Sequence, residues 1–322
     1  MEDEINIAGA SDNILATADK SIKENDKNSS EKLLFAGKNI GISISDNPDL
    51  LKLGYSPMHL QDAGIEFARY LIVHGAKLIY GGDIREHGFT NLFAELAKLY
   101  TTKDTCDESH FKSYLAWPIH LKLTKTNELD YRQNKVEIVK MPLPGTIHID
   151  STTFIDADTN EHKTIWAKSI TYMRDTMNTD CNARIFLGGP VQNFRGKYPG
   201  LVEEAWLALS KDIPVYLVGT FGGATKEIIN LLVNKSSTTL SEEFQLSDKD
   251  YDEFYKYWNV NEDDKIDYKQ LSSLFINYGL EKICNNNGLT EEENKRLFIT
   301  NSLMEMIYLV LKGLTEIKTK TL

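Results

Sequence analysis

The stretch ARIFLGGPVQNFRGKYPGLVEEAWLAL, residues 183–209, joins a strand, a glycine pair and a helix in that order. ARIFLGG is a short apolar run ending in glycines, and VEEAWLAL has apolar residues at helical spacing. PVYLVGTFGGATKEIINLLV, residues 214–233, repeats the same order. Strands that alternate with helices through glycine turns predict a parallel sheet.

The earlier part of the chain extends this pattern. KNIGISIS (38–45) reads as a strand, residues 58–74 as a helix, and AKLIY (76–80) as a strand before another glycine pair. Further segments are predicted to be a helix at 91–100, strands at LAWPIHLKL (115–123) and VEIVKMP (136–142), and a helix at 164–180. The sequence therefore predicts an α/β fold, a Rossmann-like doubly wound and mostly parallel sheet with a C-terminal helical extension.

Composition divides the chain into three parts. Residues 1–36 hold few large apolar side chains and the polar run SIKENDKNSS, which predicts a disordered tail or linker. Residues 37–235 contain the strand and helix alternation. Residues 236–322 are charged and helix-prone, and we expect them to pack on the core as a helical extension. Within them, Thr290 followed by Glu291 to Glu293 is typical of a helix start.

Charge and targeting features narrow the function classes. The 322-residue chain has a net charge of -11, which disfavours nucleic acid and anionic membranes as partners. No run approaches the roughly 18 apolar residues of a membrane-spanning helix, and the acidic start MEDEINIAGASDN is unlike a signal peptide, so we expect a cytoplasmic protein. The cysteines Cys106, Cys181 and Cys284 are widely spaced and are expected to be reduced packing or surface residues.

Glycine turns follow three of the predicted strands, at the edge where open α/β sheets bind ligands. Glycines there let the backbone approach an anion at a helix N-terminus, although glycine after a strand is also ordinary turn chemistry. Neither GxxxxGK[ST] nor a clean GxGxxG is present. The candidate ligand-binding residues at these turns and on the first strand are Ser43, Ser45, Gly81, Gly82, Asp83, Gly88, Phe89, Gly188, Gly189, Gly222 and Gly223. Asp83 either caps its turn or takes ribose hydroxyls, and the two serines either contact phosphate or close their turn.

The motifs YMRDTM (172–177), ARIFLGG and PGLVEE (199–204) together resemble the signature of the lysine-decarboxylase-like LOG phosphoribohydrolases. On that resemblance Arg174, Gly200 and Glu204 match the family's arginine, glycine and last glutamate. Leu201 stands where those enzymes have threonine, and PVQNFRGKYP lengthens their compact turn. The pattern is more similar to the broader SLOG superfamily, which is found in bacterial defence systems and in TRPM channels, and several of whose members bind ADP-ribose-type nucleotides.

The resemblance implies roles for the residues around this turn. Arg174 would contact phosphate or the leaving group, and Glu204 would face the ribose and, in an enzyme, stabilise the developing cation. Composition alone makes both glutamates ordinary first-turn helix acids and Arg174 a solvated helix arginine. Glu203 lies about 100° from Glu204 around a helix and would then face solvent or form an ion pair. Arg195, Lys197 and Tyr198 would offer charge and a stacking face to a nucleobase, or form a flexible surface insertion.

Two functions follow from these features. The first is a sensor that binds an ADP-ribose-like, cyclic ADP-ribose-like or NAD-related ligand. Binding would change the assembly of homo-oligomers or the activity of a separate effector protein. The alternative is an N-glycosidase that releases the base from a nucleoside 5′-monophosphate or NAD-like substrate. Neither needs a cofactor. No metal site is expected, because His59, His74 and His87 lack ligand spacing and the calcium-loop-like segment 259–270 has Asp264 and Gln270 at its glycine and glutamate positions.

Overall fold

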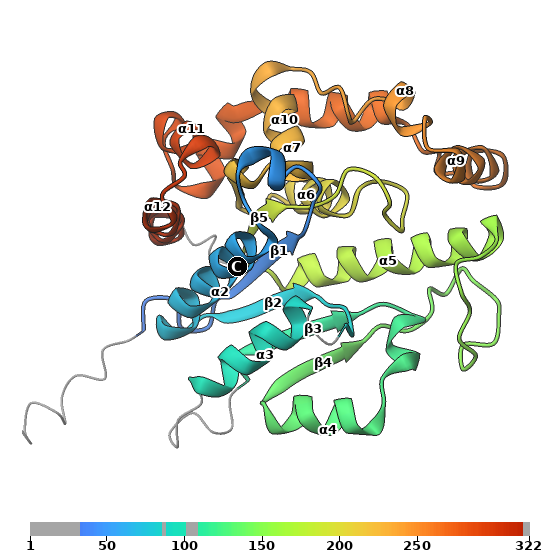
Figure 1. Cartoon of the computed structure of the whole chain (residues 1–322), viewed down its shortest axis with the longest axis horizontal. Helices are drawn as coiled ribbons and strands as arrows, with labels where there is room; N and C mark the ends of the chain where they lie inside the picture. Colours follow the sequence, from blue (N-terminus) through green and yellow to red (C-terminus); the bar gives the residue numbers. More distant parts are fainter. Residues whose placement is uncertain (1–32, 86–87, 101–108, 318–322) are drawn as a thin grey trace, which may run out of the picture.

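The computed structural model describes residues 33–85, 88–100 and 109–317, and within them the chain forms one six-stranded parallel sheet (Figure 1). The strand order is β4-β3-β2-β1-β5-β6. The strands are β1 (Asn39–Ser45), β2 (Lys77–Gly81), β3 (Phe111–Leu115), β4 (Val136–Lys140), β5 (Ala183–Gly188) and β6 (Val215–Val218). This confirms the predicted Rossmann-like α/β class. Most of the predicted tail (residues 1–32), His87 and Cys106 lie outside the described residues.

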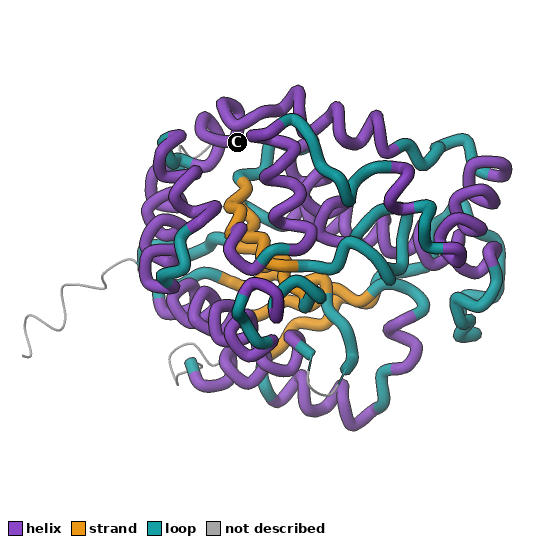
Figure 2. Tube along the Cα trace, turned by 45° about the horizontal axis from the view of Figure 1, so that its top comes forward, coloured by secondary structure: helices purple, strands orange, loops and turns teal. Residues whose placement is uncertain are grey.

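Helices cover both faces of the sheet, which Figure 2 shows as orange strands enclosed by purple helices. The helices linking the strands are α2 (Pro57–Val73), α3 (Phe89–Leu99), α4 (Lys125–Gln133), α5 (Asn160–Asp180) and α6 (Gly200–Ser210). The helices after β6 are α7 (Gly223–Asn234), α8 (Glu242–Gln245), α9 (Lys249–Asn261), α10 (Tyr268–Asn287), α11 (Glu291–Ile299) and α12 (Leu303–Glu316). The short 3₁₀ segments are η1 (Leu51–Leu53), η2 (Ile119–Lys122) and η3 (Gly219–Phe221).

Alternation along each strand divides the core into two layers. In β5, Phe186 packs with side chains of α5, α6, α9 and α10, whereas Ile185 and Leu187 pack with those of α2, α3, α11 and α12. Successive side chains of a strand point to opposite faces, so a strand with apolar residues on both must be covered on both. The long apolar runs in the sequence are the consequence of this double burial.

One strand lies elsewhere than predicted. The strand expected at residues 115–123 is wrong, because β3 occupies Phe111–Leu115 and the chain then passes a cis Trp117–Pro118 bond into η2. Pro118 has no backbone N–H and cannot donate to a sheet ladder, so the apolar run around it cannot be a central strand. The sequence FKSYL hides its strand character because it places Lys112 and Ser113 in a buried sheet.

Helix α2 begins at a well-defined cap. Ser56 and His59 form a capping box, and Pro57 occupies the first helical position, where its missing N–H costs nothing. Gly64 brings the helix close to the sheet, because a Cβ there would lie 2.8 Å from Ile44 Cδ1. His59 is therefore engaged by the helix start, and His74 Nδ1 lies 2.7 Å from the Tyr70 carbonyl at the other end.

The helices after α7 cover the β6 side of the sheet and the helices next to it. Helix α10 packs along α7, and α9 packs against α5. Asn287, at the end of α10, donates through Nδ2 to the Val215 carbonyl at 3.0 Å, and its own carbonyl accepts from the Tyr216 hydroxyl at 2.7 Å. The outer edge of β6 is thus hydrogen-bonded to the turn before α11. None of the helices in the described part of the chain is long and apolar enough to cross a membrane.

Candidate functional site

The strand order places a topological switch point between β1 and β5. The strands are neighbours in register, with Ser45 opposite Gly188, yet α2 follows β1 on one face and α6 is reached from β5 on the other. In open α/β sheets this crevice at the carboxyl ends of the strands is the usual ligand site. The glycine turns predicted after β2, β5 and β6 therefore lie at the same edge of the sheet as the end of β1.

Four charged side chains meet beside this crevice, and we call them the charge quartet: Arg174, Arg184, Glu203 and Glu204. Arg174 comes from α5, Arg184 from β5, and the two glutamates from the N-terminal half of α6. All four are buried. Two cations and two anions balance, which is how charged groups are tolerated away from water.

Glu204 is hydrogen-bonded through one carboxylate oxygen and faces a cation with the other. Oε2 accepts from the Ser43 hydroxyl at 2.8 Å and from Arg184 Nη2 at 2.6 Å. Oε1 lies 3.4 Å from Arg174 Nε. Only 10% of the Glu204 side chain is exposed. The structure therefore brings the predicted residues Ser43, Arg174 and Glu204 together, with Arg184 among them.

Of the two positions expected for Glu203, facing solvent or forming an ion pair, the structure shows the ion pair. Its Oε2 accepts from Arg174 Nη1, and its Oε1 accepts from the Thr171 hydroxyl at 2.6 Å. Neighbours on a helix point in directions about 100° apart, so the two glutamates reach different partners. Arg174 consequently bridges them from α5.

Arg184 is the functional-site residue that the sequence interpretation missed. It is completely buried and donates to Asn178 Oδ1 and Ser43 Oγ, both at 2.6 Å. Gly41 in β1 makes room for it, because a Cβ there would lie 3.0 Å from Arg184 Cγ. The available signal was a charged residue inside an apolar central strand, since such a residue must be paired with an opposite charge.

The turn after β2 is closed by its own polar groups. Asp83 accepts from the backbone N–H of Arg85 at 3.1 Å and from Arg85 Nε at 2.9 Å, as in the capping alternative. A Cβ on Gly82 would lie 2.2 Å from Ser113 Oγ, and one on Gly88 equally close to Asp83 Oδ1.

Arg85, Phe89 and Asp46 also lie at or beside this turn. Arg85, which the sequence interpretation left out, presents a 70% exposed side chain at this edge. Phe89 packs into the core against Tyr80 and Phe93. Burial raises the pKa of Asp46 at the end of β1, and the nearby Arg85 charge partly offsets that rise. The turn thus offers one exposed cation between two carboxylates.

The second and third glycine turns pack on each other. The Gly189 carbonyl accepts from Ala224 N at 2.8 Å, and a Cβ on Gly223 would lie 2.2 Å from that carbonyl. Gly188, Gly189 and Gly222 have left-handed φ angles of +64°, +88° and +68°. Gly200 admits Arg174 to the start of α6, because a Cβ there would lie 2.6 Å from Arg174 Nη2.

The basic and aromatic residues of the insertion after β5 point in two directions, some toward the helical extension and one toward α5. Lys197 is buried against Asp264, and the Tyr198 hydroxyl accepts from Asp267 N at 2.9 Å, so both lie in the contact with the helical extension. Burial raises the pKa of Tyr198 to about 12. Arg195 is exposed and stacks over Trp166. The structure thus places Lys197 and Tyr198 away from the sheet edge.

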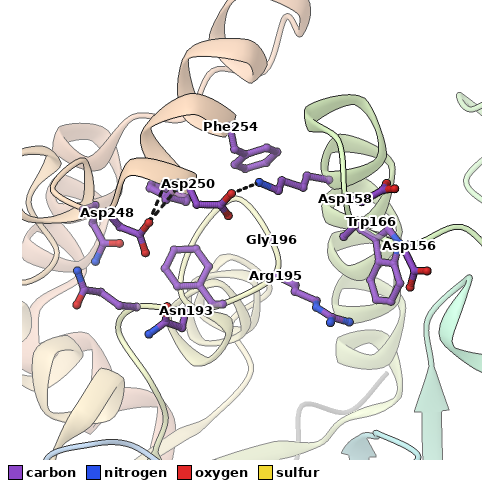
Figure 3. A pocket seen from close by; sticks show the side chains of 15 residues that line it. Asp156, Asp158, Trp166, Asn193, Arg195, Gly196, Asp248, Asp250 and Phe254 are labelled. Carbon is purple, nitrogen blue, oxygen red and sulfur yellow. Dashed lines mark hydrogen bonds and ion pairs between the residues drawn. The ribbon is translucent and has the colours of Figure 1, made fainter.

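A cavity of about 490 Å³ lies between the N-terminal part of α5, this insertion and the helices α8 and α9 (Figure 3). Gly196 forms part of its wall, and a Cβ on Gly196 would lie 3.4 Å from Arg174 Nη1. The cavity and the charge quartet are therefore separated by one residue of backbone. A volume of this size is typical of small-molecule sites.

The calcium-loop-like segment is occupied by lysines of the chain itself. Lys265 Nζ donates to the carbonyls of Asn259 and Glu262 at 2.9 and 2.5 Å, and Lys197 pairs with Asp264. Across the residues that the structure describes, no group of three or more His, Cys, Asp or Glu side chains could hold a metal ion.

Comparison with known proteins identifies the family. Among solved structures, the X-ray structure of TM1055, a structural genomics target, is similar with a TM-score of 0.37 and 16% identity, covering 61% of this chain and 83% of that one. No curated protein matches the sequence. The family model described as SLOG cluster2 matches residues 34–297, which include every strand of the sheet and the helices through most of α11. The chain therefore belongs to the SLOG cluster2 family.

Proposed function

We propose that this protein is a sensor that binds a nucleotide-derived ligand at the crevice between β1 and β5 without cleaving it. The ligand classes are those expected from the sequence, namely ADP-ribose-like, cyclic ADP-ribose-like or NAD-related molecules. Membership of the SLOG family supports a nucleotide-related role. The choice between binding and cleavage rests on the structure of the charge quartet.

Features of the crevice suit a phosphate group. The backbone N–H groups at the start of α6 lie beside the Arg174 guanidinium, which Gly200 admits without a clash. Helix N-termini attract anions through their dipole, and guanidinium groups bind phosphate with two parallel hydrogen bonds. Arg85 adds an exposed cation at the neighbouring turn. A ligand phosphate would therefore meet hydrogen-bond donors from both sides of the crevice, in competition with the carboxylates that now pair with the two arginines.

The observation that favours binding over cleavage is the engagement of Glu204. Stabilising a ribosyl cation requires a carboxylate whose charge is directed at the substrate. Here Oε2 already accepts from Arg184 and Ser43, and Oε1 faces Arg174. Turning this carboxylate toward a ligand would leave the buried Arg184 guanidinium without its anion. Glu204 is thus suited to holding Arg174 and Arg184 in place.

The alternative N-glycosidase has one observation in its favour, the approach of Arg174 Nε to within 3.4 Å of Glu204 Oε1 at the helix start. This pair is where the resemblance to the LOG enzymes places the residues that act on the substrate. A ligand phosphate could draw Arg174 away and free one carboxylate oxygen. Turnover is therefore measured alongside binding.

The test combines calorimetry and product analysis on the full chain. Wild-type protein is titrated with ADP-ribose, cyclic ADP-ribose and NAD, and each ligand is then incubated with protein and analysed for released base by chromatography. We expect binding of at least one ligand, loss of that binding in Arg174→Gln, and no base release. Arg132→Gln, an exposed arginine on α4, is the matched control.

Two results would overturn this proposal. Base release that Glu204→Gln abolishes while circular dichroism shows an intact fold would establish the enzyme. Absence of binding by all three ligands at high micromolar concentration would exclude the sensor in this form. Size-exclusion chromatography with and without the bound ligand then tests the proposed output through homo-oligomers.

A further inference from the structure

The cavity beside the charge quartet has an acidic and aromatic lining. Its carboxylates belong to Asp156, Asp158, Asp248 and Asp250, and its cations to Lys163 and Arg195, so the lining carries an excess of two negative charges. Asp156, Asp158 and Asp250 are 76%, 66% and 79% exposed at the side chain, which places their charges at the rim. Phosphate is disfavoured in such a cavity, and cations are attracted.

The deeper walls are aromatic. Trp166, Tyr251 and Phe254 are largely buried in the core and present their remaining surface to the cavity, joined by the half-buried Phe194. Phe194 and Tyr251 meet edge to face with their ring centroids 5.1 Å apart. Aromatic faces stack with flat rings, so this wall favours a planar group. Because the faces also carry partial negative charge, they add to the attraction of the cavity for a cation.

A planar cation from the chain itself already uses this wall. The Arg195 guanidinium lies over the Trp166 ring, 4.8 Å from its centroid, and Figure 3 shows both side chains at the cavity with Asp156 beyond the indole. Arg195 is exposed and belongs to a glycine-flanked insertion, so its side chain can leave by giving up its contact with Trp166. The guanidinium therefore marks where the positive ring of a ligand can stack.

We propose that this cavity binds the planar cationic heterocycle of a pyridinium nucleotide, with Arg195 as the intramolecular group that the ring displaces. The inference rests on the proposed function, because the phosphates of the same ligand would lie at Arg174 on the other side of Gly196. It narrows the ligand class to nucleotides with a positively charged ring. The oxidised and reduced nicotinamide dinucleotides form the matched probe pair, since they differ at the ring by its positive charge.

The experiment is calorimetric titration of the full chain with NAD, NADH, ADP-ribose and nicotinamide riboside. NAD should bind about 3- to 10-fold more tightly than NADH, the range expected for one cation and aromatic contact. Nicotinamide riboside, which keeps the cationic ring but has no phosphate, should bind measurably. NAD and nicotinamide riboside should both bind more tightly to the Arg195→Ala variant than to the wild-type protein. The competing guanidinium is gone, and the cavity lining carries a larger excess of negative charge.

Charge variants supply the control. In Asp156→Asn combined with Asp158→Asn, the preference for NAD over NADH should fall toward one. Asp130→Asn with Asp263→Asn removes two exposed carboxylates outside the cavity lining and should leave the preference unchanged.

Three outcomes decide the inference. Equal affinity for NAD, NADH and ADP-ribose would overturn the cationic-ring site while leaving the proposed sensor intact. Weaker binding in Arg195→Ala would overturn it as well, because Arg195 would then hold an anionic part of the ligand. Failure of every probe to bind would overturn this inference, and it would remove the proposed function as well if cyclic ADP-ribose also failed to bind.

Discussion

Arg184 is a cation in the interior of a parallel sheet, and its environment explains how the sheet tolerates it. Its guanidinium reaches Glu204, Ser43 and Asn178, three partners that come from three different elements. A buried charge of this kind gains stability only as long as each partner remains, because an unpaired ion in a low-dielectric interior is costly. The arginine therefore ties β1, α5 and α6 together at the crevice.

Replacement of Arg184 by Met should lower the free energy of unfolding by about 3–5 kcal/mol, because it removes the cation hydrogen-bonded to the buried Glu204 carboxylate and leaves only the more distant Arg174. Urea unfolding followed by circular dichroism measures this loss. Adding Glu204→Gln should recover part of it, since the neutral amide no longer needs a cation. Arg132→Met on α4 is the surface control and should change stability by no more than about 0.5 kcal/mol. A loss below about 1 kcal/mol in Arg184→Met would contradict this account of the quartet.

Cys181 should react slowly with alkylating agents in the folded protein. Burial raises the pKa of its thiol to about 11, so at pH 8 only about one thiol in a thousand is the reactive thiolate. Peptide mapping after iodoacetamide treatment, with and without urea, gives the ratio of rates. We expect labelling to be at least about 100-fold faster in urea and to rise with pH toward 11 in the native protein. Equal labelling in both states would show that the thiol is accessible.

At the scale of elements, the alternation of strands and helices was predictable because doubly buried strands are long apolar runs bounded by glycine. The exceptions were elements whose character depends on distant partners. FKSYL forms β3 although Lys112 interrupts it, because the amine is satisfied by Asp180 from the end of α5 at 2.6 Å. No local pattern reveals such a pairing across 68 positions.

The candidate site was predictable to the same degree. Arg174, Ser43 and Glu204 follow from motif and strand position, and the structure brings them together. The direction in which Lys197 and Tyr198 point does not follow from motif or strand position. It is set by their contacts with Asp264 and Asp267 in the helical extension. Which wall an insertion faces is decided by tertiary packing, and sequence spacing contains no information about it.

The insertion and the extension should be energetically coupled through Lys197 and Asp264. A double-mutant cycle with Lys197→Met and Asp264→Ala isolates their interaction, with Asp263→Ala as control. We expect a coupling of about 0.5–1 kcal/mol, because the Asp264 side chain is 74% exposed and solvent screens the pair. Strictly additive single-variant effects would mean that the two segments contact each other without stabilising one another.

At the scale of the whole molecule, the helices after residue 235 complete the fold of the sheet domain. Phe298 of α11 packs closely on Gly219, because a Cβ on Gly219 would lie 2.4 Å from the carbonyl oxygen of Phe298. Buried side chains of α9 and α10 share a cluster with those of α5 and α6. The helical extension proposed from the sequence thus shares its core with the strands.

A chain that stops at residue 235 should therefore fail to fold cooperatively, because it would expose apolar surface on both faces of the sheet. Thermal unfolding of residues 1–235, expressed alone and together with residues 236–322, tests this expectation. Alone, the fragment should aggregate or show no sharp transition, and co-expression should restore one. A sharp transition in the isolated fragment would instead make the extension a separable domain.

The hydrogen bonds of Asn287 have a consequence for how copies of this protein can assemble. With the Val215 carbonyl already bonded and the start of α11 packed on β6, another chain cannot add a strand there. The opposite edge strand, β4, presents the exposed charges of Glu137 and Lys140, which disfavour strand addition. Any oligomer that this protein forms should therefore join through helical surfaces, so that subunits can rotate or separate without breaking a shared sheet.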